Sequence, residues 1–397
     1  MAHRGKRKVS RRFLCASEEN LTPRISPARE IAYDVLLAVD RGGYASDLLL
    51  ARSAGLDSRD AGLAAEIVFG ALRFQLQLDY LIEHYSGRAA KLDTEVRVAL
   101  RMGIYQLRYL DRVPAHAAVG ESVELIKLAR KRSATGFANA VLRKVNRQPE
   151  VWPNRAVELS HPEWLLARWD AQFGVESTAI ALANLRPPEL YVRSPHGAPA
   201  GAEPTGIDGC YRMKGGEPGG YRIQDIGSQS IVPLLELGPG LTFLDLCASP
   251  GNKTAQALEY GAQAIACDMH FSRMEPLRTL GIPLVVLDGR SPLPFRRQFD
   301  RILVDAPCSG TGTLSRNPEI KWRLRPADID DLRARQRALL EQARNALAPG
   351  GILVYSTCAL EHEENEEIVG ALASRTVRRT PGQDPGDGFF AAVIKQP

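Results

Sequence analysis

Two cysteines of this chain stand where thiol chemistry is possible, Cys308 at the end of D-A-P-C and Cys358 at the end of Y-S-T-C. The apolar runs just before them, residues 301–304 and 352–355, are typical of buried strands in a parallel sheet. Ligands bind outside the carboxyl ends of such strands, so two thiols there indicate paired chemistry. Free cysteines are more often small buried hydrophobic residues, however, and the thiols alone leave both interpretations open with equal weight.

The stretch D-L-C-A-S-P-G-N-K-T, residues 245–254, follows another expected strand and precedes a helix. Its small residues let the backbone approach a ligand at the helix N-terminus. It lacks the glycine spacing of a dinucleotide fold and the Gly-Lys-Ser/Thr of a Walker loop, which indicates a cofactor other than a nucleoside triphosphate. Asp268 ends the next strand, where a Rossmann-like fold places a carboxylate on ribose, and Asp288 ends the third, within reach of an adenine. Taken singly, each aspartate is equally compatible with a strand-end turn.

A sheet is needed to bring these residues together, and the C-terminal half of the chain has the pattern of one. Helical stretches separate several of the expected strands, the clearest over residues 328–347. This alternation predicts a Rossmann-like α/β domain with a doubly wound, mostly parallel sheet. The expected strands cover residues 241–246, 264–267, 284–287, 301–304 and 352–355.

The N-terminal third has a different pattern, with apolar residues at three- and four-residue steps. It predicts an all-helical bundle of about five helices over residues 26–147, in which residues 60–82 form one helix. The first helix begins at Ser26-Pro27 and stops at Gly42-Gly43. Residues 160–186 are expected to be helical as well. Residues 195–220, rich in glycine and proline, are expected to be a linker or a reduced loop region.

The overall composition narrows the class of protein. A length of 397 residues predicts two or three domains, and 44% apolar with 24% charged residues is ordinary for a globular protein. The apolar run after the basic N-terminus is too short for a signal peptide, and no 18-residue apolar stretch is present, so we expect a cytoplasmic protein. Six cysteines without a C-x-x-C pair or clustered histidines predict reduced thiols and no metal site.

The distribution of charge says more than the net charge of +5. Residues 127–148 contain basic residues and no acidic one, a pattern that a phosphate backbone would favour. A solvated helical face is the alternative, and charge alone puts nucleic-acid contact only modestly ahead of it. The candidate RNA-binding residues are Lys127, Arg130, Lys131, Arg132, Arg143, Lys144 and Arg147.

Taken together, D-L-C-A-S-P-G-N-K-T, D-A-P-C-S-G-T-G and Y-S-T-C-A-L followed by E-E-N-E resemble the motifs of the RNA cytosine 5-methyltransferases. The helical part resembles the NusB-like domain of the bacterial RsmB/Sun/Fmu 16S ribosomal RNA methyltransferases, through L-R-M-G-I-Y-Q, V-P-A-H-A and F-A-N-A-V-L-R. R-N-P-E-I-K-W-R and D-G-F-F extend the similarity, which covers nearly the whole chain from Ser26. It implies a basic, disordered tail (1–25), a NusB-like RNA-binding domain (26–150), a connector with a shortened RNA-recognition-like region (151–222) and a methyltransferase domain (223–397).

The resemblance also implies the chemistry. Cys358 would add to carbon 6 of a cytosine, which makes carbon 5 able to accept a methyl group. Asp305 would hydrogen-bond the base, Lys253 would contact Asp305 and help proton removal, and Cys308 would promote release. The implied partner is RNA, most of all 16S ribosomal RNA with an unstacked target base, and we expect a monomer. The implied cofactor is S-adenosylmethionine, held by Cys247, Ala248, Ser249, Pro250, Gly251, Asn252, Lys253, Asp268, Asp288 and Asp305.

The chain departs from the family in three places. Asn252 stands where the family has glycine, residues 191–224 keep a Gly/Pro-rich remnant of a longer insert, and the stretch between Asp268 and Asp288 is short, which weakens the assignment of Asp288 to the adenine. Two other functions stay open. One is a non-catalytic RNA-binding or assembly factor with a vestigial second domain, against which the intact Cys308, Cys358, Asp305 and Lys253 argue. The other is a methyltransferase with transfer RNA or DNA as its acceptor.

Overall fold

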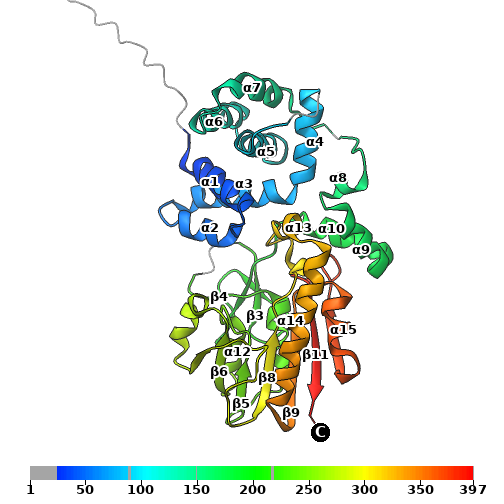
Figure 1. Ribbon diagram of the computed structural model, residues 1–397. Helices are drawn as coiled ribbons and strands as arrows, with labels where there is room; N and C mark the ends of the chain where they lie inside the picture. The colour runs from blue at the N-terminus through cyan, green and yellow to red at the C-terminus, as the bar shows by residue number, and fades with distance from the viewer. Residues whose placement is uncertain (1–24, 88–90, 149, 216–218, 397) are drawn as a thin grey trace, which may run out of the picture.

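The computed structural model describes residues 25–87, 91–148, 150–215 and 219–396. An all-helical part and an α/β part lie one above the other, with a helical connector beside their junction (Figure 1). The expected basic tail lies outside the described residues, except for Ile25.

The helices of the N-terminal part meet in one apolar core. Ser26 and Pro27 start the first helix as predicted, and Gly42, with φ of +107°, follows its end. The described helices are α1 (Pro27–Asp40), α2 (Ala45–Arg52), α3 (Ser58–Arg73), α4 (Gln75–Ser86), α5 (Thr94–Tyr109), α6 (Ala115–Leu128) and α7 (Thr135–Lys144).

Two details of this bundle differ from the prediction. The prediction of a single helix over residues 60–82 is wrong. Phe74 leaves helical geometry and separates α3 from α4, and its ring stacks on Tyr109 with the ring centroids 4.6 Å apart. The short α2 was not expected, and only Ala45 and Leu49 of it are buried. An amphipathic pattern of two residues is too weak to detect in the sequence.

A seven-stranded sheet forms the centre of the α/β part, in the order β10-β11-β9-β8-β5-β6-β7. The predicted strands pair in parallel from β5 to β9, which confirms the doubly wound sheet. β10 and β11 are antiparallel and were not predicted. The strands are β5 (Thr242–Asp245), β6 (Gln263–Asp268), β7 (Leu284–Val286), β8 (Phe299–Asp305), β9 (Leu347–Thr357), β10 (Arg375–Arg379) and β11 (Phe389–Lys395).

Alternate residues of the central strands face two separate cores. Leu244, Ile302 and Leu353 pack on one face with α14 (Pro326–Asn345) and α15 (Glu366–Val369). Phe243 and Leu303 face the opposite core, which contains residues of α12 (Asn252–Leu258). Because both faces are covered, the strands are apolar throughout, which is why they could be recognised in the sequence.

The connector helices pack against the loops that follow β8 and β9. They are α8 (Arg155–Leu159), α9 (Glu163–Phe173) and α10 (Ser177–Asn184), and they confirm helix over most of residues 160–186. Trp169 of α9 is fully buried in a cluster with Leu314 and Leu360. The connector therefore supports the edge of the sheet at which Cys308 and Cys358 lie.

The expectation of a linker over residues 195–220 is wrong, because two strands of a small antiparallel sheet lie there. Its order is β2-β3-β1-β4, and Cys210 of β3 is buried with Tyr191 of β1. Gly201 and Gly209, at φ of +74° and +69°, supply turns next to strands, so the glycines reflect tight turns and not a flexible chain. The strands are β1 (Tyr191–Arg193), β2 (Ala202–Pro204), β3 (Cys210–Met213) and β4 (Arg222–Ile223).

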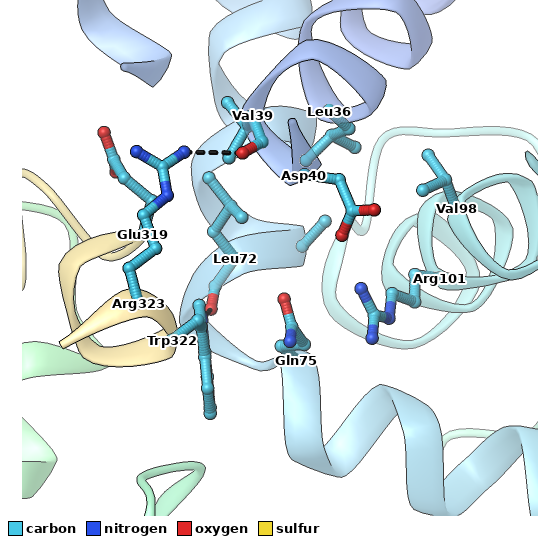
Figure 2. A pocket seen from close by; sticks show the side chains of 11 residues that line it. Leu36, Val39, Asp40, Leu72, Gln75, Val98, Arg101, Glu319, Trp322 and Arg323 are labelled. Carbon is cyan, nitrogen blue, oxygen red and sulfur yellow. Dashed lines mark hydrogen bonds between the residues drawn. The ribbon is translucent and has the colours of Figure 1, made fainter. Parts of the chain in front are cut away.

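The short helix α13 (Ile320–Arg323) joins the two parts of the molecule. It presents side-chain donors to carbonyls at the ends of α1 and α3, where helix dipoles favour positive charge. A cavity of about 160 Å³ lies at this junction, and Figure 2 shows Arg323 and Trp322 beside it. The bonds run from Lys321 Nζ to Arg73 O (2.9 Å), from Trp322 Nε1 to Leu72 O (2.7 Å) and from Arg323 to Val39 O (2.6 Å).

Candidate active site

The thiols of Cys308 and Cys358 lie side by side past the ends of β8 and β9, with their Sγ atoms 3.3 Å apart. The backbone N–H of Cys358 also donates to Cys308 Sγ at 3.3 Å, and both residues are half-buried. The hydrogen bond to Cys358, together with burial, raises the pKa of Cys308 well above its usual range. The protonated thiol is therefore the favoured form of Cys308.

The pairing of β8 with β9 continues beyond the strands and sets this distance. Ala306 N donates to Ser356 O, and Gly312 N donates to Cys358 O, both at 2.8 Å. A Cβ atom on Gly312 would lie 2.5 Å from Gly388 O and 2.7 Å from Cys358 O. Only glycine permits this approach, so the loop after β8 is held directly against the Cys358 peptide.

An ion pair lies at the same edge of the sheet. Lys253 Nζ donates to Asp305 Oδ2 at 2.6 Å, and Ser356 Oγ donates to Asp305 Oδ1 at 2.8 Å. Burial alone would lower the pKa of Lys253, but the Asp305 carboxylate raises it above its usual value, and Cys358 adds to this effect. Lys253 is therefore a fixed positive charge near the Cys358 sulfur.

Phe389 is a further residue of this region, and its place was missed in the sequence. Its ring centroid lies 5.3 Å from Lys253 Nζ, within cation–π range, and the ring is buried. The signal that could have located it is the unbroken apolar run of β11, which follows Asp387-Gly388.

The loop between β5 and α12, with the first turn of α12, carries the expected cofactor residues Cys247 to Lys253. Ala248 N donates to Cys267 O at 2.8 Å, and Ser249 N donates to Asp268 Oδ2 at 3.2 Å, which fixes the loop against the end of β6. Gly251 has φ of +110°, and a Cβ atom there would lie 2.8 Å from the Leu277 side chain. Burial raises the pKa of Cys247 well above its usual range, so this thiol is inert.

Residues just beyond β6 and β7 fit a nucleoside. Asp268 is half-buried, and among the described residues it accepts backbone N–H groups alone, from Ser249 and from His270 at 2.9 Å. Two neighbouring apolar side chains are exposed. Met269, which follows Asp268 in the sequence, is 48% exposed, and Val286, the partner of Asp268 in the pairing of β6 with β7, is 51% exposed. A carboxylate beside uncovered apolar surface suits ribose hydroxyls and an aromatic base. Sequence reasoning missed Met269 and Val286, although each stands next to a strand end.

Asp288 also follows β7, but its carboxylate is already engaged. Arg290 binds both of its oxygens, with Nη2 2.7 Å from Oδ2 and Nε 2.8 Å from Oδ1. Hydrogen bonds from Arg290 lower the pKa of Asp288 to about 2. A ligand would have to share this carboxylate with Arg290.

Asp245, at the end of β5, is a buried carboxyl that sequence reasoning did not single out. Thr254 Oγ1 donates to its Oδ2 at 2.6 Å, while Oδ1 has no hydrogen-bond partner among the described residues. Burial raises the pKa of Asp245 to about 7. An unpartnered acceptor at the base of this loop fits a site that is completed by a bound molecule.

The seven candidate RNA-binding cations lie on or next to α6 and α7, at the end of the helical part away from α13 (Figure 1). Several of them are occupied within the protein. Lys127 pairs with Glu124, Lys131 with Asp93, Lys144 with Tyr85 O and Arg147 with Asp111. Arg130 and Arg132 are exposed, and Arg143 is exposed with a bond to Asn139. This surface is thus less positive than the sequence indicates, and it is distant from the thiols.

Neither a metal-binding cluster nor a membrane-spanning helix is present among the described residues. No group of three or more His, Cys, Asp and Glu side chains in the described part of the chain could hold a metal ion. No described helix is long and apolar enough to cross a membrane.

Comparison with known proteins agrees with this geometry. A family model described as 16S rRNA methyltransferase RsmB/F matches residues 232–395, and one for the NusB family matches residues 26–147. Proteins named ribosomal RNA small subunit methyltransferase B are similar along most of their length. The protein from Cronobacter sakazakii is 33% identical, covering 90% of this chain and 95% of the relative. The protein from Yersinia pestis is 34% identical, covering 92% and 98%.

Solved structures share the fold. A crystal structure titled PH0851 aligns with a TM-score of 0.78 and 22% identity, over 94% of this chain and 99% of that one. A methyltransferase homologue from Pyrococcus horikoshii aligns with a TM-score of 0.50 and 24% identity, over 62% of this chain and all of that one. From the matched family models and the relatives that span nearly its whole length, the chain belongs to the RsmB/F family of 16S rRNA methyltransferases.

Proposed function

We propose that this protein transfers a methyl group from S-adenosylmethionine to carbon 5 of a cytosine in 16S ribosomal RNA, through a covalent adduct with Cys358. The observation that carries the proposal is the thiol pair, with sulfurs 3.3 Å apart, beside the Lys253–Asp305 ion pair. The relatives named for small-subunit ribosomal RNA support the acceptor.

The reaction requires a nucleophile on the enzyme, the role proposed for Cys358. Carbon 5 of cytosine is a poor nucleophile, so the Cys358 thiolate first forms a bond to carbon 6, which makes carbon 5 electron-rich. Bound S-adenosylmethionine would supply the methyl group from its positively charged sulfur, and cleavage of that methyl–sulfur bond would leave S-adenosylhomocysteine as the second product. After transfer, the proton on carbon 5 leaves to a base, the bond between carbon 6 and Cys358 Sγ breaks, and the thiolate is restored.

The other residues bind the base and move protons. Asp305, held between Lys253 and Ser356, can accept a hydrogen bond from the exocyclic amine of cytosine. The Lys253 ammonium stabilises negative charge on Cys358 before attack. Cys308 keeps its proton and lies against the reacting sulfur, so it can stabilise the departing thiolate during release.

The cofactor fits the loop between β5 and α12 and the ends of β6 and β7. Asp268 would accept the ribose hydroxyls, and Met269 and Val286 would cover the adenine faces. Asp288, engaged by Arg290, would contact the adenine edge only through an oxygen shared with that arginine. We propose that the target cytosine is unstacked, because a base inside a duplex cannot reach the Cys358 sulfur. We also propose that the free enzyme is a monomer.

Two cysteine variants test the reaction. Cys358→Ala should abolish methylation and any covalent RNA adduct, since the nucleophile is gone. Cys308→Ala should let the adduct accumulate, because release is slowed. Both are measured with 16S rRNA transcripts by denaturing gel electrophoresis for the adduct and bisulfite sequencing for the product. The buried Cys210, remote in sequence from both loops, supplies the control Cys210→Ala, which should retain activity.

The same sequencing separates the competing functions. Methylation of 16S rRNA that depends on the protein supports the proposal. Methylation of transfer RNA instead would show that transfer RNA is the acceptor. Retained methylation in Cys358→Ala would remove this residue as the nucleophile. No methylation of any RNA by the wild-type chain would favour a non-catalytic RNA-binding factor.

A further inference from the structure

We infer that two adjacent residues, Glu364 and Asn365, are positioning residues that act on different cysteines. Glu364 holds the loop that carries Cys308, and Asn365 holds the loop that carries Cys358. Both lie in the turn after β9, where η6 (His362–Glu364) leads into α15. The inference rests on the proposed function, since it assigns one residue to adduct formation and the other to adduct breakdown.

The contacts of Glu364 enclose Cys308 from both sides along the chain. Ser309 N, just after the cysteine, donates to Glu364 Oε1 at 2.8 Å. Gln336 of α14 donates through Nε2 both to Glu364 Oε1, at 2.9 Å, and to Pro307 O, just before the cysteine, at 3.0 Å. Gln336 and Glu364 are fully buried. The pair therefore fixes the backbone on each side of Cys308.

The contacts of Asn365 enclose Cys358 in the same way. Thr357 Oγ1, just before the cysteine, donates to Asn365 Oδ1 at 2.5 Å. Asn365 Nδ2 donates to Ala359 O, just after it, at 3.0 Å. Asn365 is fully buried, and its amide donor and acceptor are both used. One rigid dipeptide thus sets the positions of both thiols relative to each other.

The burial of the Glu364 carboxyl group without a cation indicates a role other than general stability. Among the described residues no lysine or arginine forms an ion pair with it, and its Oε2 has no hydrogen-bond partner. Burying a carboxyl group without a cation costs stability. A glutamine could supply the same acceptor to Ser309 N and Gln336, so Glu364→Gln should preserve the position of the loop.

Loss of the contacts of Glu364 or of Asn365 should change one of the two steps, adduct formation or adduct breakdown, more than the other. A shift of about 1 Å in a reacting group can slow a step by about 100-fold. Glu364→Ala should therefore slow adduct breakdown by about tenfold or more while adduct formation changes little. Asn365→Ala should slow adduct formation, because it releases the loop of the nucleophile.

The experiment is a single-turnover reaction of the full-length protein with a 16S rRNA transcript and S-adenosylmethionine. Samples quenched over time are resolved on denaturing gels, which gives separate rates for the appearance and the loss of the adduct. Glu367→Ala is the matched control, because Glu367 lies on α15, is partly exposed and pairs with Arg333. Thermal unfolding of each variant confirms that it folds. If Asn365→Ala does not fold, Asn365→Asp keeps the acceptor for Thr357 and replaces the donor to Ala359 with a carboxyl oxygen.

The expected result is slowed breakdown in Glu364→Ala, slowed formation in Asn365→Ala or Asn365→Asp, and near-normal rates in Glu364→Gln and the control. Equal slowing of both steps in each variant would indicate a structural role and overturn the inference, as would rates that do not change. These results leave the proposed function intact, provided that the wild type forms the adduct. A wild-type chain that methylates RNA without any adduct would contradict the proposed function instead.

Discussion

Asp245 shows how the site couples ionisation to stability. Burial raises its pKa from an ordinary 3.8 to about 7, so folding favours the protonated form. The stability that this group contributes is complete below its ordinary pKa and is lost as the pH rises through about 7. As the pH rises from about 5 to about 8, we expect the free energy of unfolding to fall less in Asp245→Asn than in the wild type.

Urea unfolding at several pH values measures this difference. Burial also raises the pKa of Glu364 to about 7, and this group contributes in the same direction. The free energy of unfolding of Asp245→Asn should therefore still fall as the pH rises, but less steeply than that of the wild type. Asp330→Asn, on the exposed face of α14, is the control and should follow the wild-type pH dependence. Parallel curves for Asp245→Asn and the wild type would contradict a raised pKa at this position.

At the residue scale, the sequence predicts groups whose type and spacing define chemistry. Cys308, Cys358, Asp305 and Lys253 stand in recognisable motifs, and the structure brings them together. Gln336 carries no such signal, because a buried glutamine on an amphipathic helix looks like any other polar residue. Its role depends on the packing of α14 against the loop after β8, which no local pattern encodes.

At the scale of elements, the loop after β8 depends on Gly312. A methyl group there would press on the carbonyls of Gly388 and Cys358, so Gly312→Ala should cost about 1–3 kcal/mol and displace Cys358. We expect methylation to fall well beyond the loss that unfolding explains. Gly238→Ala, where nothing lies within 4 Å of the added carbon, is the control. Calorimetry and initial rates measure the two effects, and normal activity in Gly312→Ala would refute the tight contact.

The elements that the sequence predicted have clear patterns, periodic in helices such as α1 and α14 and continuously apolar in the strands β5 to β9. The small sheet β1–β4 was missed because charged residues interrupt its short strands and its glycines look like those of a linker. β11 was missed although its residues 389–394 are apolar, because no helix directly precedes it as the parallel pattern would require.

At the scale of the whole molecule, α13 holds the helical part on the α/β part. Arg323 donates to carbonyls of Val39, Gly42 and Gly43 at the end of α1. Arg323→Ala should weaken this junction by about 2 kcal/mol, the value of hydrogen bonds from a charged donor. Calorimetry should then show two separated unfolding transitions. In methylation assays, the apparent affinity for 16S rRNA should fall more than the maximal rate. Arg337→Ala, on the exposed face of α14, is the control, and one unchanged transition in Arg323→Ala would contradict the role of this junction.

The cluster around Trp169 has a practical consequence for anyone dissecting this enzyme. Leu314 and Leu360, which follow Cys308 and Cys358 in the sequence, are buried in one cluster with side chains of the connector. A recombinant fragment that starts at residue 223 would leave both leucines in water together with the indole of Trp322. Such a fragment should be prone to aggregation, and co-expression with residues 25–222 on a second polypeptide should restore its solubility.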